Sequence, residues 1–212
     1  NKKKIYRHSY TADYYVWDIM TKTLTPLSNN GSQQVATFSP DGERVAFVRK
    51  NNIFIKSLKF NTEYQATTDG KANEILNGIP DWVQEEEFGY SRAFEWSPDS
   101  KMLAFLKFNE KNVPVVTIPE YKGLAPEKKE YATYSSFDSL KYPKAGENNS
   151  VVTVHVYELK NKTIIRVKTG DDEEVYFPRI EWTPSGSDLA IMKLNRHQNQ
   201  MEMLYANPYT GD

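Results

Sequence analysis

The chain has 212 residues, with 27 lysines and arginines against 28 aspartates and glutamates, which gives a formal net charge of −1 at pH 7. This balance argues against a nucleic-acid-binding protein that works by counterion release, and no apolar run reaches the ~18 residues of a transmembrane helix. The absence of cysteine excludes disulfides, thiolate nucleophiles and zinc–thiolate sites together. At the N-terminus, residues 1–5 lack the apolar core of a signal peptide, and the chain begins abruptly, as if inside a domain.

In chain order, residues 14–24 predict the last two strands of an incomplete sheet, and three segments that share one pattern follow them. In each segment an aromatic residue precedes Ser or Thr, proline, a short polar turn and an apolar run. Proline suits the first corner of a β-turn, and the apolar run after the turn predicts a strand buried on both faces. The three segments begin at Phe38, Trp96 and Trp182, and their apolar runs are 45–48, 103–106 and 189–192.

Further strands are predicted after each apolar run, because apolar and polar residues then alternate between turn-forming clusters. Four short strands per unit, stacked through their buried faces, are typical of a β-propeller blade. The three motifs lie 58 and 86 residues apart, whereas a blade has about 40–50 residues. We therefore predict one insertion near 71–91, between blades, and a second, inside a blade, that forms an arm at about 112–149.

The predicted fold is all-β: a partial β-propeller of about three and a half four-stranded blades, within a single domain that spans residues 1–212. The blade pieces are expected at about 1–28, 33–70, 91–170 and 175–212. Because the last blade stops one strand short, we expect an open arc with uncovered blade faces at both ends. Such an arc is not expected to be a self-sufficient catalyst.

One short helical segment is predicted near 82–88. Asp81 can cap its first turn, Gln84 stands three residues later as in a capping box, and Gly89 can end it. A strand is disfavoured here because three successive glutamates would alternate between the two faces and place at least one charge in the interior.

Motifs that carry catalysis are absent from the sequence. There is no Gly-x-Ser-x-Gly nucleophile elbow, no phosphate-binding loop and no dinucleotide-binding glycine motif. The three histidines, His8, His155 and His197, have no partner at metal-ligand spacing, so neither a metal nor a cofactor is predicted. His155 falls in an apolar strand, which favours a hydrogen-bonded structural role. On its own residues the chain is predicted to be non-catalytic.

The run Glu85-Glu86-Glu87 is the strongest local oddity. Its ordinary interpretation is a solvated helical face, because like charges repel one another and solvent tolerates them. The alternative is a cation site, since an ammonium group offers three donors that two converging carboxylates can accept. Arg7, between aromatic residues and just before a predicted strand, is either an ordinary strand-edge arginine or a ligand for a carbonyl, a carboxylate or one of these glutamates.

Four segments of the chain resemble the propeller domain of the dipeptidyl peptidase IV family, in the same order and at similar spacing. The Trp-Ser-Pro-Asp segment occurs in many propellers, whereas the other three are specific to this family. The resemblance extends from about Tyr6 to the end of the chain. The segments are Arg7-His-Ser-Tyr-Thr-Ala12, Asp81-Trp-Val-x-Glu-Glu-Glu87, Trp96-Ser-Pro-Asp99 and Tyr142-Pro-Lys-Ala-Gly146.

The resemblance implies a serine exopeptidase that removes N-terminal dipeptides with Pro or Ala in the second position. In this family an eight-bladed propeller covers a C-terminal α/β-hydrolase domain, which holds the Ser-Asp-His triad and is absent from this chain. By the family motif, Glu86 and Glu87 bind the free α-amine of the peptide substrate, and Arg7 contacts a backbone carbonyl near its N-terminus. Glu85 is not implied as a ligand, and Gln84 replaces a tyrosine that is common in the family.

The resemblance also implies partners and a location. The arm at about 112–149 corresponds to a family extension that helps to form a homodimer, and exposed aromatic residues are favoured at interfaces. The family works outside the cytosol, so a periplasmic, extracellular or cell-surface location in a bacterium is implied. Two alternatives stay open: a stand-alone propeller that acts as a binding scaffold, and the propeller of a related oligopeptidase or acyl-peptidase. The glutamate pair argues against an endopeptidase, whose substrate has no free amine to bind. The aromatic residues predicted to be exposed on the arm are Tyr121, Tyr131, Tyr134, Phe137 and Tyr142.

Overall fold

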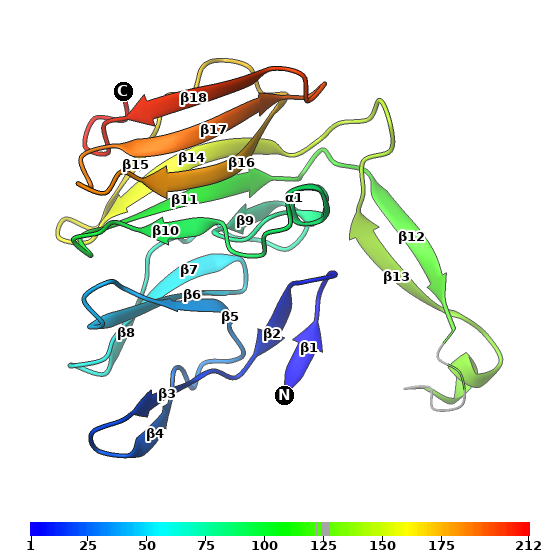
Figure 1. Ribbon diagram of the computed structural model, residues 1–212. Helices are drawn as coiled ribbons and strands as arrows, with labels where there is room; N and C mark the ends of the chain where they lie inside the picture. The colour runs from blue at the N-terminus through cyan, green and yellow to red at the C-terminus, as the bar shows by residue number, and fades with distance from the viewer. Residues whose placement is uncertain (122, 124–127) are drawn as a thin grey trace.

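The computed structural model describes residues 1–121, 123 and 128–212, and it folds into a row of antiparallel sheets with one α-helix (Figure 1). The helices are α1 (Trp82–Phe88) and the 3-10 turn η1 (Lys129–Ala132). None of the described helices is long and apolar enough to cross a membrane. The strands are β1 (Lys2–Lys4), β2 (Tyr10–Ala12), β3 (Tyr15–Asp18), β4 (Thr23–Pro26), β5 (Gln34–Phe38), β6 (Arg44–Arg49), β7 (Asn52–Ser57), β8 (Thr62–Gln65), β9 (Ile75–Asn77), β10 (Phe94–Trp96), β11 (Met102–Asn109), β12 (Val115–Glu120), β13 (Ser136–Lys141), β14 (Val151–Glu158), β15 (Thr163–Arg166), β16 (Val175–Trp182), β17 (Leu189–Asn195) and β18 (Met201–Ala206).

Three of the sheets have the strand order of propeller blades. The first runs β5-β6-β7-β8, the second β10-β11-β14-β15 with β9 added beside the end of β11, and the third β16-β17-β18. Consecutive strands pair antiparallel in each. The sheets lie face to face, the β3–β4 hairpin continues the row on its N-terminal side, and the β1–β2 hairpin stands to one side, beside β5 and below α1 (Figure 1). The prediction of an all-β partial propeller is therefore confirmed.

The Ser or Thr of the repeated motif closes the turn between the first two strands of each blade. Its hydroxyl oxygen accepts a backbone N–H five residues later, and its own N–H donates to the carbonyl of that same residue. This reciprocal pair fixes the turn and sets the register of the buried strand that follows. The hydroxyl bonds are Arg44 N to Ser39 Oγ (3.0 Å), Met102 N to Ser97 Oγ (2.9 Å) and Asp188 N to Thr183 Oγ1 (3.2 Å).

The tryptophans of the motif join neighbouring blades. The indole N–H of Trp96 donates to the carbonyl of Thr37 in β5 (3.3 Å), and that of Trp182 donates to the carbonyl of Glu95 in β10 (3.0 Å). Each tryptophan thus ends the first strand of its own sheet and binds the first strand of the sheet before it. Phe38 holds the same motif position but has no N–H, and its side chain is exposed.

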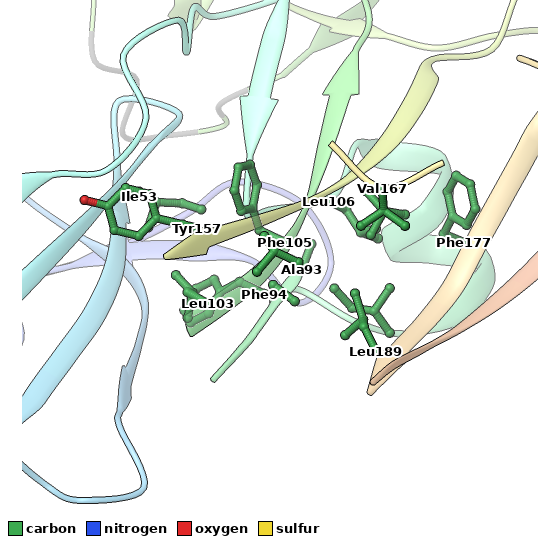
Figure 2. Close-up of a cluster of buried hydrophobic side chains, with 14 of the residues drawn as sticks. Ile53, Ala93, Phe94, Leu103, Phe105, Leu106, Tyr157, Val167, Phe177 and Leu189 are labelled. Carbon is green, nitrogen blue, oxygen red and sulfur yellow. The ribbon is translucent and has the colours of Figure 1, made fainter. Parts of the chain in front are cut away.

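The main hydrophobic core lies between the three large sheets (Figure 2). The predicted apolar runs supply its centre: residues 103–106 of β11 are all buried, and they meet side chains from β7, β10 and β16. Phe105 stacks on His155 with ring centroids 5.3 Å apart, and the Nε2 atom of His155 lies 2.8 Å from Thr153 Oγ1. Burial lowers the pKa of His155 to about 4, so the ring is neutral at pH 7. His155 is the structural histidine that the sequence predicts.

The arm is a two-stranded antiparallel ribbon of β12 and β13 that projects away from the sheets (Figure 1). It leaves the second sheet between β11 and β14, which are themselves paired neighbours. The predicted arm also contains residues 122 and 124–127, which lie outside the described residues.

Three of the five aromatic residues predicted to be exposed on the arm are exposed: Tyr121, Tyr134 and Phe137. Tyr131 is partly buried, so the prediction is wrong for this residue. The prediction is wrong for Tyr142, whose ring packs on Trp82 of α1 with centroids 4.5 Å apart. The base of the ribbon folds back onto the helix, so an aromatic side chain at that point finds an apolar partner instead of solvent.

Candidate functional site

The helix α1 carries the three glutamates, and both its ends are those that the sequence predicts. The Asp81 carboxylate caps the first turn by accepting the N–H of Gln84 (2.9 Å). Gly89 ends the helix in the left-handed conformation with φ +67°, and its N–H donates to the carbonyl of Glu85 (3.0 Å). The prediction of a short helix near 82–88 is confirmed.

Contacts at both ends hold this helix in place. Trp82 packs on Tyr142 at the N-terminal end, and Phe88 meets Tyr176 of β16 edge to face, with centroids 5.6 Å apart. The guanidinium of Arg179 donates to the carbonyl of Phe88 at the C-terminal end, at 3.4 Å from two of its nitrogens. A cation at the C-terminal end of a helix interacts favourably with the helix dipole. The helix is therefore a fixed platform, although it has only seven residues.

The three glutamates have three different environments. Glu85 is fully buried, Glu86 is partly buried and Glu87 is exposed. Neither sequence interpretation describes all three, because a solvated face would leave Glu85 in water. Successive helical residues point about 100° apart, so adjacent positions on α1 face the interior, the neighbouring hairpin and solvent in turn.

Glu85 and Glu86 both bind the loop that joins β1 to β2. The Glu85 carboxylate accepts the backbone N–H groups of His8 (2.7 Å) and Ser9 (2.9 Å) through one oxygen. Arg7 donates from Nε to Glu86 Oε2 at 2.7 Å. The structure thus brings together two of the three predicted site residues, Arg7 and Glu86, although they lie 79 positions apart in the chain.

Glu87, the third predicted site residue, lies beside a separate surface hollow of about 310 Å³. The hollow is also lined by Trp82, Val83 and the Tyr142–Gly146 stretch, so two of the family-like segments meet here. Among the described residues no hydrogen bond or ion pair links Glu87 to Arg7 or Glu86. Its exposed carboxylate is available to a ligand that approaches α1 from outside.

Two buried acidic residues, Asp81 and Glu110, lie close to each other at the start of α1. Burial raises the pKa of Asp81, and burial together with the negative charge of Asp81 raises the pKa of Glu110 to about 7, against the opposing effect of Lys141. Burial, with the charges of Glu110, Asp81 and Glu85, also raises the pKa of Tyr6 above its usual value, so its phenol stays neutral. Nothing in the local sequence around Glu110 signals this proximity.

We expect the stability of the protein to depend on pH through Glu110. Its pKa is about 7 in the folded state and 4.5 ordinarily, so the folded state holds this proton more tightly than the unfolded chain. The stabilisation is complete below about pH 4.5 and is lost as the pH rises to about 7. The glutamine side chain of the Glu110→Gln variant is uncharged at every pH in this window. The free energy of unfolding should therefore fall on the order of 1–3 kcal/mol further in the wild type than in this variant.

Thermal unfolding of the full-length protein at several pH values between about 5 and 8 measures this difference. Glu63→Gln is the matched control, because Glu63 is paired to Arg49 at 2.7 Å and its pKa is lowered, so it is ionised across the whole window. A wild type and a Glu110→Gln variant with parallel pH profiles would contradict the assignment.

Among the described residues, no group of three or more His, Asp or Glu side chains is arranged to hold a metal ion. The predicted site residues supply carboxylates and a guanidinium. One arginine and two adjacent glutamates, on a fixed helix and a hairpin loop, can bind a ligand that carries a cation next to a hydrogen-bond acceptor.

Comparison with known proteins identifies the family. Over residues 1–212 the chain matches the family model described as "Dipeptidyl peptidase IV (DPP IV) N-terminal region". The chain belongs to the dipeptidyl peptidase IV family. The family resemblance seen in the sequence is therefore confirmed.

Two members of the dipeptidyl peptidase IV family show the extent of the similarity. The crystal structure of Porphyromonas gingivalis dipeptidyl peptidase 4 is 44% identical, with a TM-score of 0.90, and the match covers 99% of this chain and 29% of that one. The dipeptidyl peptidase 4 of Trichophyton rubrum is 36% identical over 210 residues, which cover 96% of this chain and 26% of that protein. The chain thus spans less than a third of the length of these relatives.

Proposed function

We propose that this chain is the propeller region of a serine exopeptidase that removes N-terminal Xaa-Pro or Xaa-Ala dipeptides. In this proposal Glu86 and Glu87 bind the free α-amine of the substrate, and Arg7 binds a backbone carbonyl near its N-terminus. The observation that carries the proposal is the contact between Arg7 and Glu86 on α1, within a chain of the dipeptidyl peptidase IV family.

The state of the two side chains supports this role. The Arg7 side chain is 69% exposed and that of Glu86 is 18% exposed, so the pair lies at the surface with the carboxylate more enclosed than the cation. The ion pair uses the Nε of Arg7, and its two terminal nitrogens can donate to a carbonyl. A partly enclosed carboxylate attracts an ammonium group more strongly than one in bulk water.

An amine site on the propeller also explains how an exopeptidase measures its substrate. Two carboxylates that hold the ammonium group place the second peptide bond at a fixed distance from the nucleophile on the other domain. A longer N-terminal extension has no free amine at that point and leaves the carboxylates without their cation. Specificity for the removal of dipeptides then follows from the fixed distance between the bound α-amine and the nucleophile, and not only from recognition of the substrate's side chains.

The test compares two chromogenic substrates in the full-length protein. We expect a Gly-Pro or Ala-Pro anilide with a free amine to be cleaved, and its N-acetylated form to be cleaved at least about a hundredfold more slowly, as for a buried charge pair that has lost one partner. Equal cleavage of both forms would overturn the amine site and favour the oligopeptidase or acyl-peptidase alternative. Absence of cleavage with both would favour the stand-alone binding scaffold.

The same proposal includes two protein partners: the α/β-hydrolase domain of the same polypeptide and a second copy of the protein. The ribbon of β12 and β13 supports the second, because it projects from the sheets with Tyr121, Tyr134 and Phe137 exposed. Aromatic residues are enriched where interfaces form. Sedimentation of the full-length protein as a monomer at micromolar concentration would contradict this part of the proposal.

A further inference from the structure

The loop that carries Arg7 meets the rest of the molecule at α1 and through Tyr6, whose side chain is partly buried near Glu110 and Asp81. It joins β1 and β2, which pair with each other, and the hairpin continues into the row of sheets through one backbone bridge, between Ala12 and Gln33. Within the loop, Ser9 accepts the N–H of Ile5 through its carbonyl (2.9 Å) and the N–H of Tyr6 through its hydroxyl (3.2 Å). These bonds shape the loop, but they do not fix where it lies relative to the glutamates.

Glu85 fixes the backbone of the loop directly on α1. A single carboxylate oxygen accepts two consecutive backbone N–H groups, those of His8 and Ser9, and the residue is fully buried. A hydrogen bond in a low-dielectric setting is stronger than one in water. The bonded N–H groups belong to the two residues directly after Arg7, so they fix the backbone from which its side chain leaves.

The ion pair between Arg7 and Glu86 is not sufficient to do this alone. The Arg7 side chain is mostly exposed, and exposed ion pairs contribute little because solvent screens them and long side chains lose entropy. In the substrate complex, moreover, Glu86 is shared with the ammonium group. Glu85, one helix position away from Glu86, binds the backbone directly after Arg7 and does so without any contribution from a substrate.

We propose that Glu85 is a positioning residue for the amine site: it holds the β1–β2 loop on α1, so that Arg7 faces Glu86 before the substrate arrives. This inference rests on the proposed function for its effect on catalysis. The tie itself is a property of the folded chain and is tested without any substrate.

The kinetic test uses Glu85→Ala and Glu85→Gln in the full-length protein, each with and without Arg7→Ala. We expect E85A to lower kcat/KM for a free-amine Xaa-Pro anilide by about tenfold, mainly through KM, because both hydrogen bonds to the loop backbone are lost. If Glu85 acts through Arg7, E85A should cost less than about twofold more in a protein that already carries R7A. An equal loss in both backgrounds would overturn the proposal.

The glutamine variant separates positioning from general damage. Among the described residues, Glu85 Oε2 has no hydrogen-bond partner, so an amide nitrogen in its place loses no bond while the other oxygen still accepts both N–H groups. We expect E85Q to retain activity within about threefold of wild type. If E85A does not fold, the test uses Glu85→Asp instead. Aspartate is one methylene shorter, so its carboxylate lies farther from the loop, and the same loss is expected.

Amide hydrogen exchange tests the hydrogen bonds between Glu85 and the β1–β2 loop without any measurement of activity. We expect the amides of His8 and Ser9 to exchange at least about tenfold faster in E85A than in wild type, and near the wild-type rate in E85Q. Asp99→Ala is the matched control: it removes a carboxylate that also accepts a backbone N–H, that of Lys101 (3.1 Å), but in the β10–β11 turn. Unchanged exchange at His8 and Ser9 in E85A would overturn the proposal, even if the amine-site variants behave as expected.

Discussion

Replacement of Glu86 by alanine in the full-length protein should lower kcat/KM for Xaa-Pro substrates by about two to three orders of magnitude. The change removes one carboxylate from the substrate ammonium and at the same time leaves Arg7 without its partner at 2.7 Å. Breaking one side of a partly desolvated charge pair costs about 2–5 kcal/mol, and each 1.4 kcal/mol is a factor of ten. We expect Glu87→Ala to act in the same direction.

Three comparisons make this result specific. Glu86→Gln keeps the shape but removes the charge, so a loss similar to that of Glu86→Ala would assign the effect to charge. Glu43→Ala removes an exposed glutamate whose ion pair with Arg44 is long, at 3.9 Å, and should leave kcat/KM unchanged. The Tm of the Glu86 variants should differ little from that of the wild type, because the contacts at both ends of α1 do not involve Glu86. Near-normal cleavage by Glu86→Ala would contradict its assignment.

Replacement of Phe105 by alanine should destabilise the full-length protein by about 3–5 kcal/mol, the usual cost of emptying a fully enclosed aromatic site. Phe105 lies in the central strand β11, is 1% exposed and stacks on His155. Its ring lies within the main cluster of buried side chains (Figure 2). The measurement is denaturant unfolding followed by tryptophan fluorescence.

Two further variants serve as controls for this effect. Phe105→Leu keeps most of the volume and should cost less than about 2 kcal/mol. Phe60→Ala removes an exposed phenylalanine from the β7–β8 turn and should stay within about 0.5 kcal/mol of wild type. A Phe105→Ala protein as stable as Phe60→Ala would mean that the ring is not a core residue.

The blades and the helix were predictable because their signals are local. The turn after Ser39, Ser97 or Thr183 is closed by a bond to a residue five positions on, and α1 is bounded by its own cap residues Asp81 and Gly89. In both cases the residues that form the stabilising contacts are the same residues that form the recognisable sequence motif.

The burial of Glu85 was not predictable in the same way. Three successive glutamates suggest a solvated face, and the N–H groups that offset the burial of the first come from residues 77 and 76 positions earlier in the chain. The β1 strand gave no signal either, since its three lysines are all exposed and show no alternation. The exposure predicted for Tyr142 is wrong for a related reason: its partner Trp82 lies on a different element, 60 positions away.

The indole bonds of Trp96 and Trp182 make the arc mechanically uneven along its length. They tie the three large sheets into one body that resists shear, because sliding one sheet past the next must break a hydrogen bond inside an apolar setting. Phe38 has no N–H to form such a bond. The β3–β4 hairpin meets the first large sheet through the cluster of Leu27, Val45 and Phe47, and Arg49 of that sheet donates to the hydroxyl of Ser28 just after β4 (2.8 Å). The bond at this junction comes from a long side chain with several rotatable bonds, whereas the indoles of the other two junctions are rigid. We therefore expect the N-terminal junction to allow larger displacements than the other two.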